Sequence, residues 1–120
     1  MFGLPEPAII KSEIFATLPE KYQKSPPSRR ALLGQTAHGT TLEGPSFDPD
    51  GNLYVTDIPN GRVFRFAPDG NVELAAEYDG EPNGLKIHKD GRIFIADHRH
   101  GLMVMDAASG KVETFLEGSE

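Results

Sequence analysis

The stretch EGPSFDPDGNLYVTD at residues 43–57 is repeated, in altered form, as NGLKIHKDGRIFIAD at residues 83–97. The similarity extends over residues 43–77 and 83–117, two copies set 40 positions apart. Sliding one copy onto the other aligns turn residues, such as Asp50-Gly51 on Asp90-Gly91, and apolar residues, such as Phe64 on Val104. A period of about 40 residues built from short strands and Gly/Asp turns is typical of a β-propeller blade.

Each copy contains four short apolar runs separated by turn residues. Asp-Gly dipeptides favour tight hairpins because Gly readily adopts a positive φ. Leu102–Met105 is apolar at consecutive positions, which predicts a strand covered on both faces, as between stacked blades. No helical periodicity interrupts the pattern, so we expect an all-β fold with almost no α-helix. The strands are expected at 45–48, 52–57, 62–67, 71–77, 84–88, 92–97, 102–106 and 111–117.

The chain before the repeat is different in composition. Residues 8–18 alternate imperfectly between apolar and polar and predict one strand, whereas residues 19–42 contain Pro26-Pro27 and predict a long Pro/Ser-rich connection. We therefore divide the chain into residues 1–42, with the strand and loop, and residues 43–120, with blades over 43–80 and 81–120.

Composition limits the classes of function. The 120 residues carry a net charge of −6 and lack a stripe of Lys and Arg interleaved with aromatic residues, so a nucleic-acid partner is not expected. The absence of cysteine excludes disulfides and thiolate chemistry. No signal-peptide pattern and no apolar run of about 20 residues are present, which favours a cytoplasmic protein without a membrane partner.

Two blades alone would leave an apolar face and a strand edge uncovered, because closed propellers contain about 4–8 blades. Three interpretations follow: a fragment of a longer propeller, several copies that complete a ring through their exposed blade faces, or a piece that does not fold alone. We favour the fragment, because the chain stops after a fourth strand, where a third blade is expected to begin.

The motif Glu43-Gly44-Pro45 followed by Asp50-Gly51-Asn52-Leu53-Tyr54 resembles the opening blade of the senescence marker protein/gluconolactonase/luciferin-regenerating enzyme family. Residues 82–97 resemble the next blade of that family, and the similarity covers about residues 12–120. The resemblance implies a six-bladed β-propeller, of which two four-stranded blades and an N-terminal strand are present here. It also implies hydrolysis of a sugar or related lactone, with a divalent metal, usually calcium, in the central channel. Zinc, magnesium and manganese remain alternatives, because a single carboxylate ligand suits all four ions.

Glu43 matches the glutamate that binds the metal in that family; otherwise it would be a solvent-facing residue before a strand. Asn83 is its repeat equivalent and could contact the substrate or support the metal ligands, or simply complete its own turn. His100, in the cluster His98-Arg99-His100, could reach a substrate at the channel mouth, although an exposed loop is the simpler interpretation. Asp57 and Asp97 end equivalent strands and are expected to accept backbone hydrogen bonds.

We therefore expect a metal-dependent lactone hydrolase of the gluconolactonase type, acting on a small lactone. No catalytic base is identified in these residues, so the chain is expected to be incomplete and inactive alone. The alternative is a non-catalytic propeller module for binding or assembly, which could be oligomeric.

Overall fold

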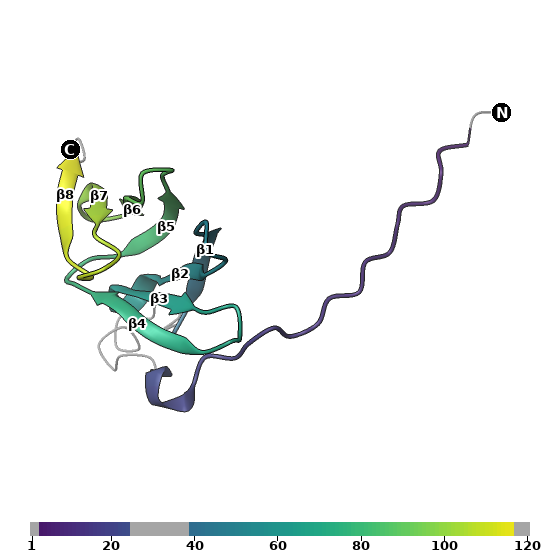
Figure 1. Cartoon of the computed structure of the whole chain (residues 1–120), viewed down its shortest axis with the longest axis horizontal. Helices are drawn as coiled ribbons and strands as arrows, with labels where there is room; N and C mark the ends of the chain where they lie inside the picture. Colours follow the sequence, from purple (N-terminus) through teal and green to yellow (C-terminus); the bar gives the residue numbers. More distant parts are fainter. Residues whose placement is uncertain (1–2, 25–38, 117–120) are drawn as a thin grey trace, which may run out of the picture.

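The computed structural model describes residues 3–24 and 39–116, and in this part of the chain the strands form two four-stranded antiparallel sheets (Figure 1). Each sheet is a meander in which sequence neighbours pair: β1-β2-β3-β4 and β5-β6-β7-β8. The strands are β1 (Leu42–Phe47), β2 (Leu53–Asp57), β3 (Arg62–Phe66), β4 (Val72–Glu77), β5 (Pro82–Ile87), β6 (Ile93–Asp97), β7 (Gly101–Met105) and β8 (Val112–Leu116).

The helices among the described residues are two single turns of 3-10 helix, η1 (Glu20–Tyr22) and η2 (Ile58–Asn60). The all-β prediction is therefore confirmed, with two tandem sheets of the kind that form propeller blades. None of the helices in the described residues is long and apolar enough to cross a membrane.

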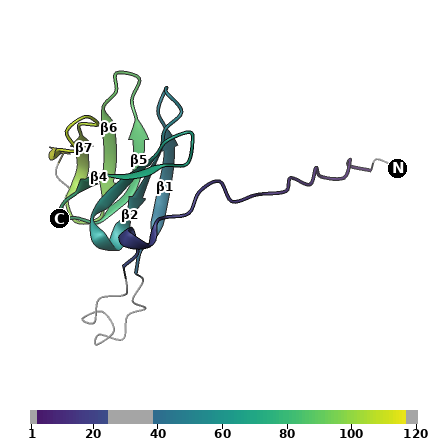
Figure 2. The ribbon, with the colours of Figure 1, turned by 60° about the horizontal axis from the view of Figure 1, so that its bottom comes forward.

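The two sheets pack face to face, with β1 and β2 of the first sheet against β5 of the second (Figure 2). Their shared core is apolar and excludes water from both facing surfaces. Its buried members are Tyr54, Val63, Ala76, Leu85, Ile93, Ile95, Met103 and Met105. Burial of these side chains fixes how one blade is oriented on the next.

The offset between equivalent residues of the two blades is not 40 throughout. Asp57 pairs with Arg62 across the β2–β3 link, but Asp97 pairs with Gly101 across the β6–β7 link, which is one residue shorter. Phe64 is therefore structurally equivalent to Met103, since each pairs with the matching residue of its neighbour, Val55 or Ile95. The predicted alignment of Phe64 on Val104 is wrong, because a shift of one residue moves a side chain to the opposite face of a sheet.

The prediction that Leu102–Met105 is covered on both faces is half right. Met103 and Met105 are buried against the first sheet, whereas Leu102 and Val104 face the other way and are only partly buried among the described residues. Phe115 and Leu116 of β8 are 54% and 65% exposed. We call the surface formed by Phe94, Leu102, Val104, Phe115 and Leu116 the open face of the second blade.

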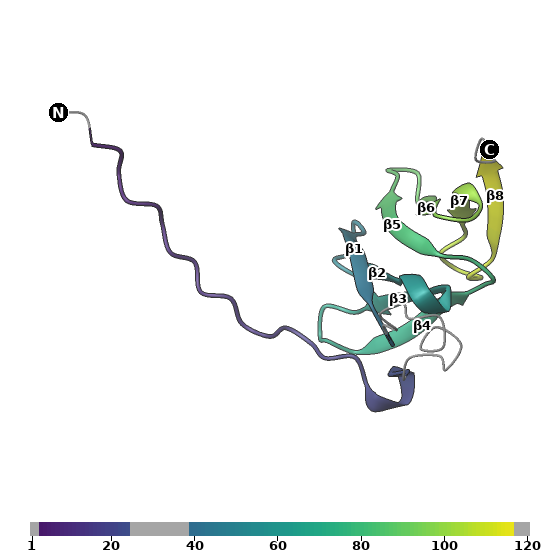
Figure 3. The ribbon, with the colours of Figure 1, turned by 180° about the vertical axis from the view of Figure 1, so that it is seen from behind.

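The strand expected over residues 8–18 is not formed. Residues 3–19 have no strand partner, and the segment extends away from the sheets (Figures 1 and 3). Ile9, Ile10 and Ile14 are between 86% and 90% exposed. An alternating sequence is able to form a strand, but it does so only when a sheet edge supplies hydrogen bonds.

The end of this segment packs on the first blade instead. Leu18 is buried in a second apolar cluster with Val55, Phe64 and Phe66, and the Tyr22 ring lies 5.1 Å from the Phe64 ring. Residues 16–22 thus cover the face of the first blade that points away from the second. Of the connection predicted over residues 19–42, the part that contains Pro26-Pro27, residues 25–38, lies outside the described residues.

Candidate functional site

The candidate residues lie at one end of the two sheets. Leu42 pairs with Asp57 and Pro82 pairs with Asp97, so each first strand begins where each second strand ends. Figure 2 shows β1 and β5 beside each other, with the hairpin turns at one end of the strands and η2 at the other. Glu43, Asn83 and the link that contains His100 all belong to the η2 end.

Glu43 lies within β1 rather than before it, which corrects the predicted start of that strand. It pairs with Thr56 beside a register shift in β1. The side chain is exposed, and its Oε2 atom accepts a 3.4 Å hydrogen bond from the amide of Gly44. This exposed carboxylate on the first strand of the blade is accessible to a ligand.

Asn83 follows Pro82 in β5 as Glu43 follows Leu42 in β1, but it lies inside the register shift between Pro82 and Gly84, and the residue that pairs with Ala96 is Gly84. Asn83 is exposed, and within residues 3–24 and 39–116 its side-chain amide has no hydrogen-bond partner. Within the described residues, the Asn83 side chain therefore does not form the turn hydrogen bond that the alternative interpretation expected.

The backbones of Glu43 and Asn83 meet at Thr56. The Oγ1 atom of Thr56 lies 3.2 Å from the carbonyl oxygen of Glu43 and 3.1 Å from that of Asn83. The sequence interpretation did not identify Thr56. The available signal was a break in the repeat, because the equivalent position holds Ala96.

Asp57 has a structural role in the first blade, where its buried carboxylate accepts hydrogen bonds. Its carboxylate accepts hydrogen bonds from the amide of Thr41 at 2.9 Å and from Nε of Arg62 at 2.8 Å, and its side chain is 0% exposed. Arg62 also donates to the carbonyl of Tyr22 at 2.8 Å. The predicted structural role of Asp57 is confirmed, and Arg62 ties the N-terminal segment to the blade.

Asp97 has the same role in the second blade. It accepts hydrogen bonds from the Tyr78 hydroxyl at 2.7 Å and from the amides of Glu81, Arg99 and His100 at 2.8–2.9 Å. Burial tends to raise the pKa of the Asp97 carboxyl, but these hydrogen bonds outweigh it and hold the pKa below its ordinary value. Burial, with the bond to Asp97, raises the pKa of the Tyr78 phenol.

His100 belongs to this structural network. Its Nε2 atom lies 2.7 Å from the carbonyl oxygen of Asp79, and Arg99 forms an ion pair with the Asp79 carboxylate at 2.8 Å. The structure therefore ties His100 to the β4–β5 link and does not join it to Glu43 or Asn83 by a hydrogen bond. His98 is exposed.

The donor chemistry of Glu43 and Asn83 fits a hard divalent cation, which prefers carboxylate and amide oxygens. Their number does not complete a site. Calcium takes about six to eight oxygen ligands, and one carboxylate supplies at most two. The described part of the chain contains no group of three or more His, Cys, Asp or Glu residues that could hold a metal ion.

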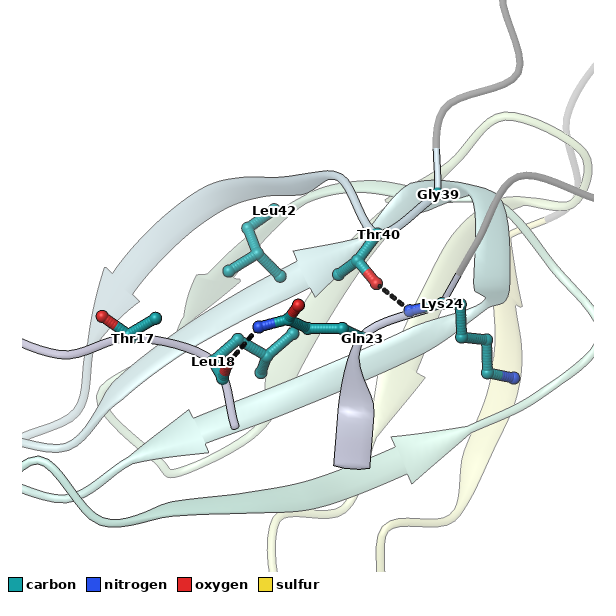
Figure 4. A pocket seen from close by; sticks show the side chains of 7 residues that line it. All are labelled: Thr17, Leu18, Gln23, Lys24, Gly39, Thr40 and Leu42. Atoms are coloured by element: carbon teal, nitrogen blue, oxygen red, sulfur yellow. Dashed lines mark hydrogen bonds between the residues drawn. The ribbon is translucent and has the colours of Figure 1, made fainter. Parts of the chain in front are cut away.

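Two hollows lie near the candidate residues. The first, of about 420 Å³, lies between the N-terminal segment and the start of β1 (Figure 4). Gln23 donates to the carbonyl of Leu18 at 2.9 Å, and the amide of Lys24 donates to Thr40 Oγ1 at 3.0 Å along its wall. Its lining residues are Thr17, Leu18, Gln23, Lys24, Gly39, Thr40 and Leu42.

The second hollow, of about 400 Å³, is more apolar and lies on the open face of the second blade. Gly44, Gly84, Phe94 and Leu102 contribute to its lining. Its wall includes Gly44 and Gly84, the residues that follow Glu43 and Asn83, and does not include His100.

Comparison with known proteins gives a consistent result. Residues 41–120 match the family model described as the SMP-30/Gluconolactonase/LRE-like region. The chain is 33% identical over 100 residues to Lactonase drp35 of Staphylococcus saprophyticus, a match that covers 77% of this chain and 31% of the relative. It is 38% identical over 60 residues to Lactonase drp35 of Staphylococcus aureus MRSA252, which covers 48% of this chain and 18% of the relative. The chain therefore spans less than a third of the length of these curated relatives.

Proposed function

Because the chain belongs to the SMP-30/Gluconolactonase/LRE-like family, we propose that it forms part of a metal-dependent lactone hydrolase of the gluconolactonase type. The observation that supports this function is the presence of two exposed oxygen donors, Glu43 and Asn83, on the first strands of adjacent blades. Their backbones are joined through the Thr56 hydroxyl. Relatives that match this part of the chain are named lactonases.

In this proposal the Glu43 carboxylate binds the divalent cation, with calcium preferred. When bound, such a cation polarises the lactone carbonyl and stabilises negative charge on its oxygen. The Asn83 amide is neutral and can both donate and accept hydrogen bonds, so it orients the substrate or the groups around the cation.

We propose that the remaining ligands, and the carboxylate that activates water, do not come from the described residues. The reason is the count of donors, because Glu43 can fill only one or two of the six to eight positions that calcium requires. The 120-residue chain by itself is therefore expected to bind a cation weakly and to hydrolyse lactones at a negligible rate.

The test combines two measurements on the 120-residue chain and its Glu43→Gln variant. Gluconolactone hydrolysis is assayed with calcium or zinc, and backbone amide shifts are followed during a calcium titration. We expect equal, negligible turnover for both proteins, and calcium-dependent shifts around Glu43 that the variant loses. Turnover well above that of the variant would refute the inactivity of the chain, and unchanged shifts in the wild type would refute the metal role of Glu43.

A second candidate function is supported by the open face of the second blade, where Phe115 and Leu116 are more than half exposed. An apolar surface of this kind suits a binding or assembly module. A stable trimer in light scattering, without calcium-dependent shifts at Glu43, would favour this alternative over the hydrolase.

A further inference from the structure

Thr56 connects two blades through a single hydroxyl group. It lies in β2, is 0% exposed, and places Oγ1 within hydrogen-bond distance of the carbonyls of Glu43 in β1 and Asn83 in β5. A hydroxyl has one hydrogen to donate, so it either alternates between the two carbonyls or shares its hydrogen between them. In both cases the two carbonyl oxygens lie within 3.2 Å of one hydroxyl oxygen.

The backbone around this hydroxyl is irregular on both strands. The pairing of β1 with β2 shifts between Glu43 and Ser46, and that of β5 with β6 shifts between Pro82 and Gly84. Such irregularities interrupt the regular hydrogen bonds of a sheet and redirect nearby side chains. A buried donor at this point therefore fixes two strand segments whose own ladders are interrupted.

The hydroxyl is not a general requirement of a blade. The equivalent position in the second blade is Ala96, which has no donor. Within the described residues the bridge occurs only where the first blade meets the second, at the backbone of the two residues that carry the exposed oxygen donors. This placement argues for a role in the candidate site as well as in packing.

We propose that Thr56 is a positioning residue that sets the separation of Glu43 and Asn83, so that both side chains can act on one bound cation and its ligand. This inference rests on the proposed function of Glu43. If the hydroxyl is lost, the two strands keep their apolar contacts, but the polar link that aligns the two donors disappears.

The test uses the 120-residue chain with three variants. Thr56→Val removes the hydroxyl while keeping a similar shape, Thr56→Ser restores it, and Val63→Ala removes buried apolar contact beside Thr56 while leaving its hydroxyl in place. Val63 is a suitable control because it pairs with Thr56 and is 0% exposed. Two properties are measured: the carbonyl ¹³C shifts of residues 43 and 83 without metal, and Mn²⁺ line broadening at the amides of the same residues.

We expect Thr56→Val to move both carbonyl shifts and to weaken Mn²⁺ binding about tenfold, the lower end of the loss seen when a supporting hydrogen bond is removed from a metal site. Broadening at Asn83 should fall relative to broadening at Glu43. Thr56→Ser should restore both properties, and Val63→Ala should change neither. Unchanged shifts and broadening in Thr56→Val would overturn the proposal.

The outcomes separate this inference from the proposed function. If the wild type shows no broadening at Glu43, the metal role fails, and the inference fails with it even if the carbonyl shifts confirm the bridge. If Thr56→Val does not fold, the wild-type hydroxyl proton decides: a proton protected from exchange supports the bridge, and a rapidly exchanging one overturns it.

Discussion

Gly44 and Gly84 meet backbone to backbone where the two blades join. A Cβ atom built on Gly44 would lie 2.5 Å from the Cα atom of Gly84 and 3.1 Å from the carbonyl oxygen of Asn83. Gly44 also has a φ of +56°, which side chains rarely adopt. The first strands of the two blades are close enough to share Thr56 because no side chain separates them.

Replacement of Gly44 by Ala is expected to destabilise the chain by about 3 kcal/mol, from the combined cost of backbone strain and overpacking. Gly84→Ala is the matched control, because a Cβ atom there meets nothing within 4 Å. Urea unfolding measures both variants. Equal stability of the two variants would contradict the close contact.

Asp57→Asn is expected to cost about 3–5 kcal/mol, because it leaves the buried Arg62 guanidinium without its charged partner. The side chains of this pair are 3% and 0% exposed. Glu73→Gln makes the same chemical change in the exposed pair with Arg65 and should cost at most about 1 kcal/mol. Similar losses for both variants in urea unfolding would refute the importance of burial.

The free energy of unfolding should depend on pH through the Asp97 carboxyl. Its folded-state pKa is lowered from 3.8, so its contribution is present above that ordinary value and is lost as the pH falls through the folded-state pKa. The free energies of unfolding of the wild type and Asp97→Asn should therefore differ at neutral pH and converge as the solution is acidified below 3.8. Parallel curves from pH-dependent urea unfolding would contradict this assignment.

Leu18→Ala should destabilise the first blade by about 2 kcal/mol, the lower end for a buried leucine. Leu18 is 8% exposed and packs on Phe64 and Phe66, whereas Ile9 is 90% exposed. Ile9→Ala is therefore expected to change stability by less than about 0.5 kcal/mol. A thermal unfolding scan that finds equal effects would show that the N-terminal segment does not cover the blade.

Self-association should depend on the open face of the second blade. Introducing lysine at both Phe115 and Leu116 places charge on that face and should reduce concentration-dependent association in light scattering. Lysine at both Ile9 and Ile10, which are equally apolar but lie on the extended segment, should leave association largely unchanged. The reverse result would assign association to the N-terminal segment.

The repeat and its turn residues predicted the strands well, because hairpin turns are encoded locally. Asp48, for example, accepts hydrogen bonds from the amides of Asp50 and Asn52 within its own turn. The strand expected at residues 8–18 failed for the opposite reason. Its partner would have to be a distant sheet edge, and no local pattern reveals whether that edge is present.

The same contrast explains the candidate site. Repeat equivalence alone placed Glu43 and Asn83 at matching positions of two blades. It could not identify Thr56, whose role depends on a contact between residues 27 positions apart. It also misaligned Phe64, because Gly61 and Gly101 match at a spacing of 40 and conceal the shorter second link.

Alternation and turn residues close together in the chain were enough to predict the all-β class, the two four-stranded units and the positions of their turns. They did not predict which faces are buried, that residues 16–22 cover the first blade, or that the Thr56 hydroxyl lies within hydrogen-bond distance of the carbonyls of both Glu43 and Asn83. Burial and backbone contact between blades depend on how whole sheets pack, and packing joins residues that are distant in sequence, so these features appear only in the folded chain.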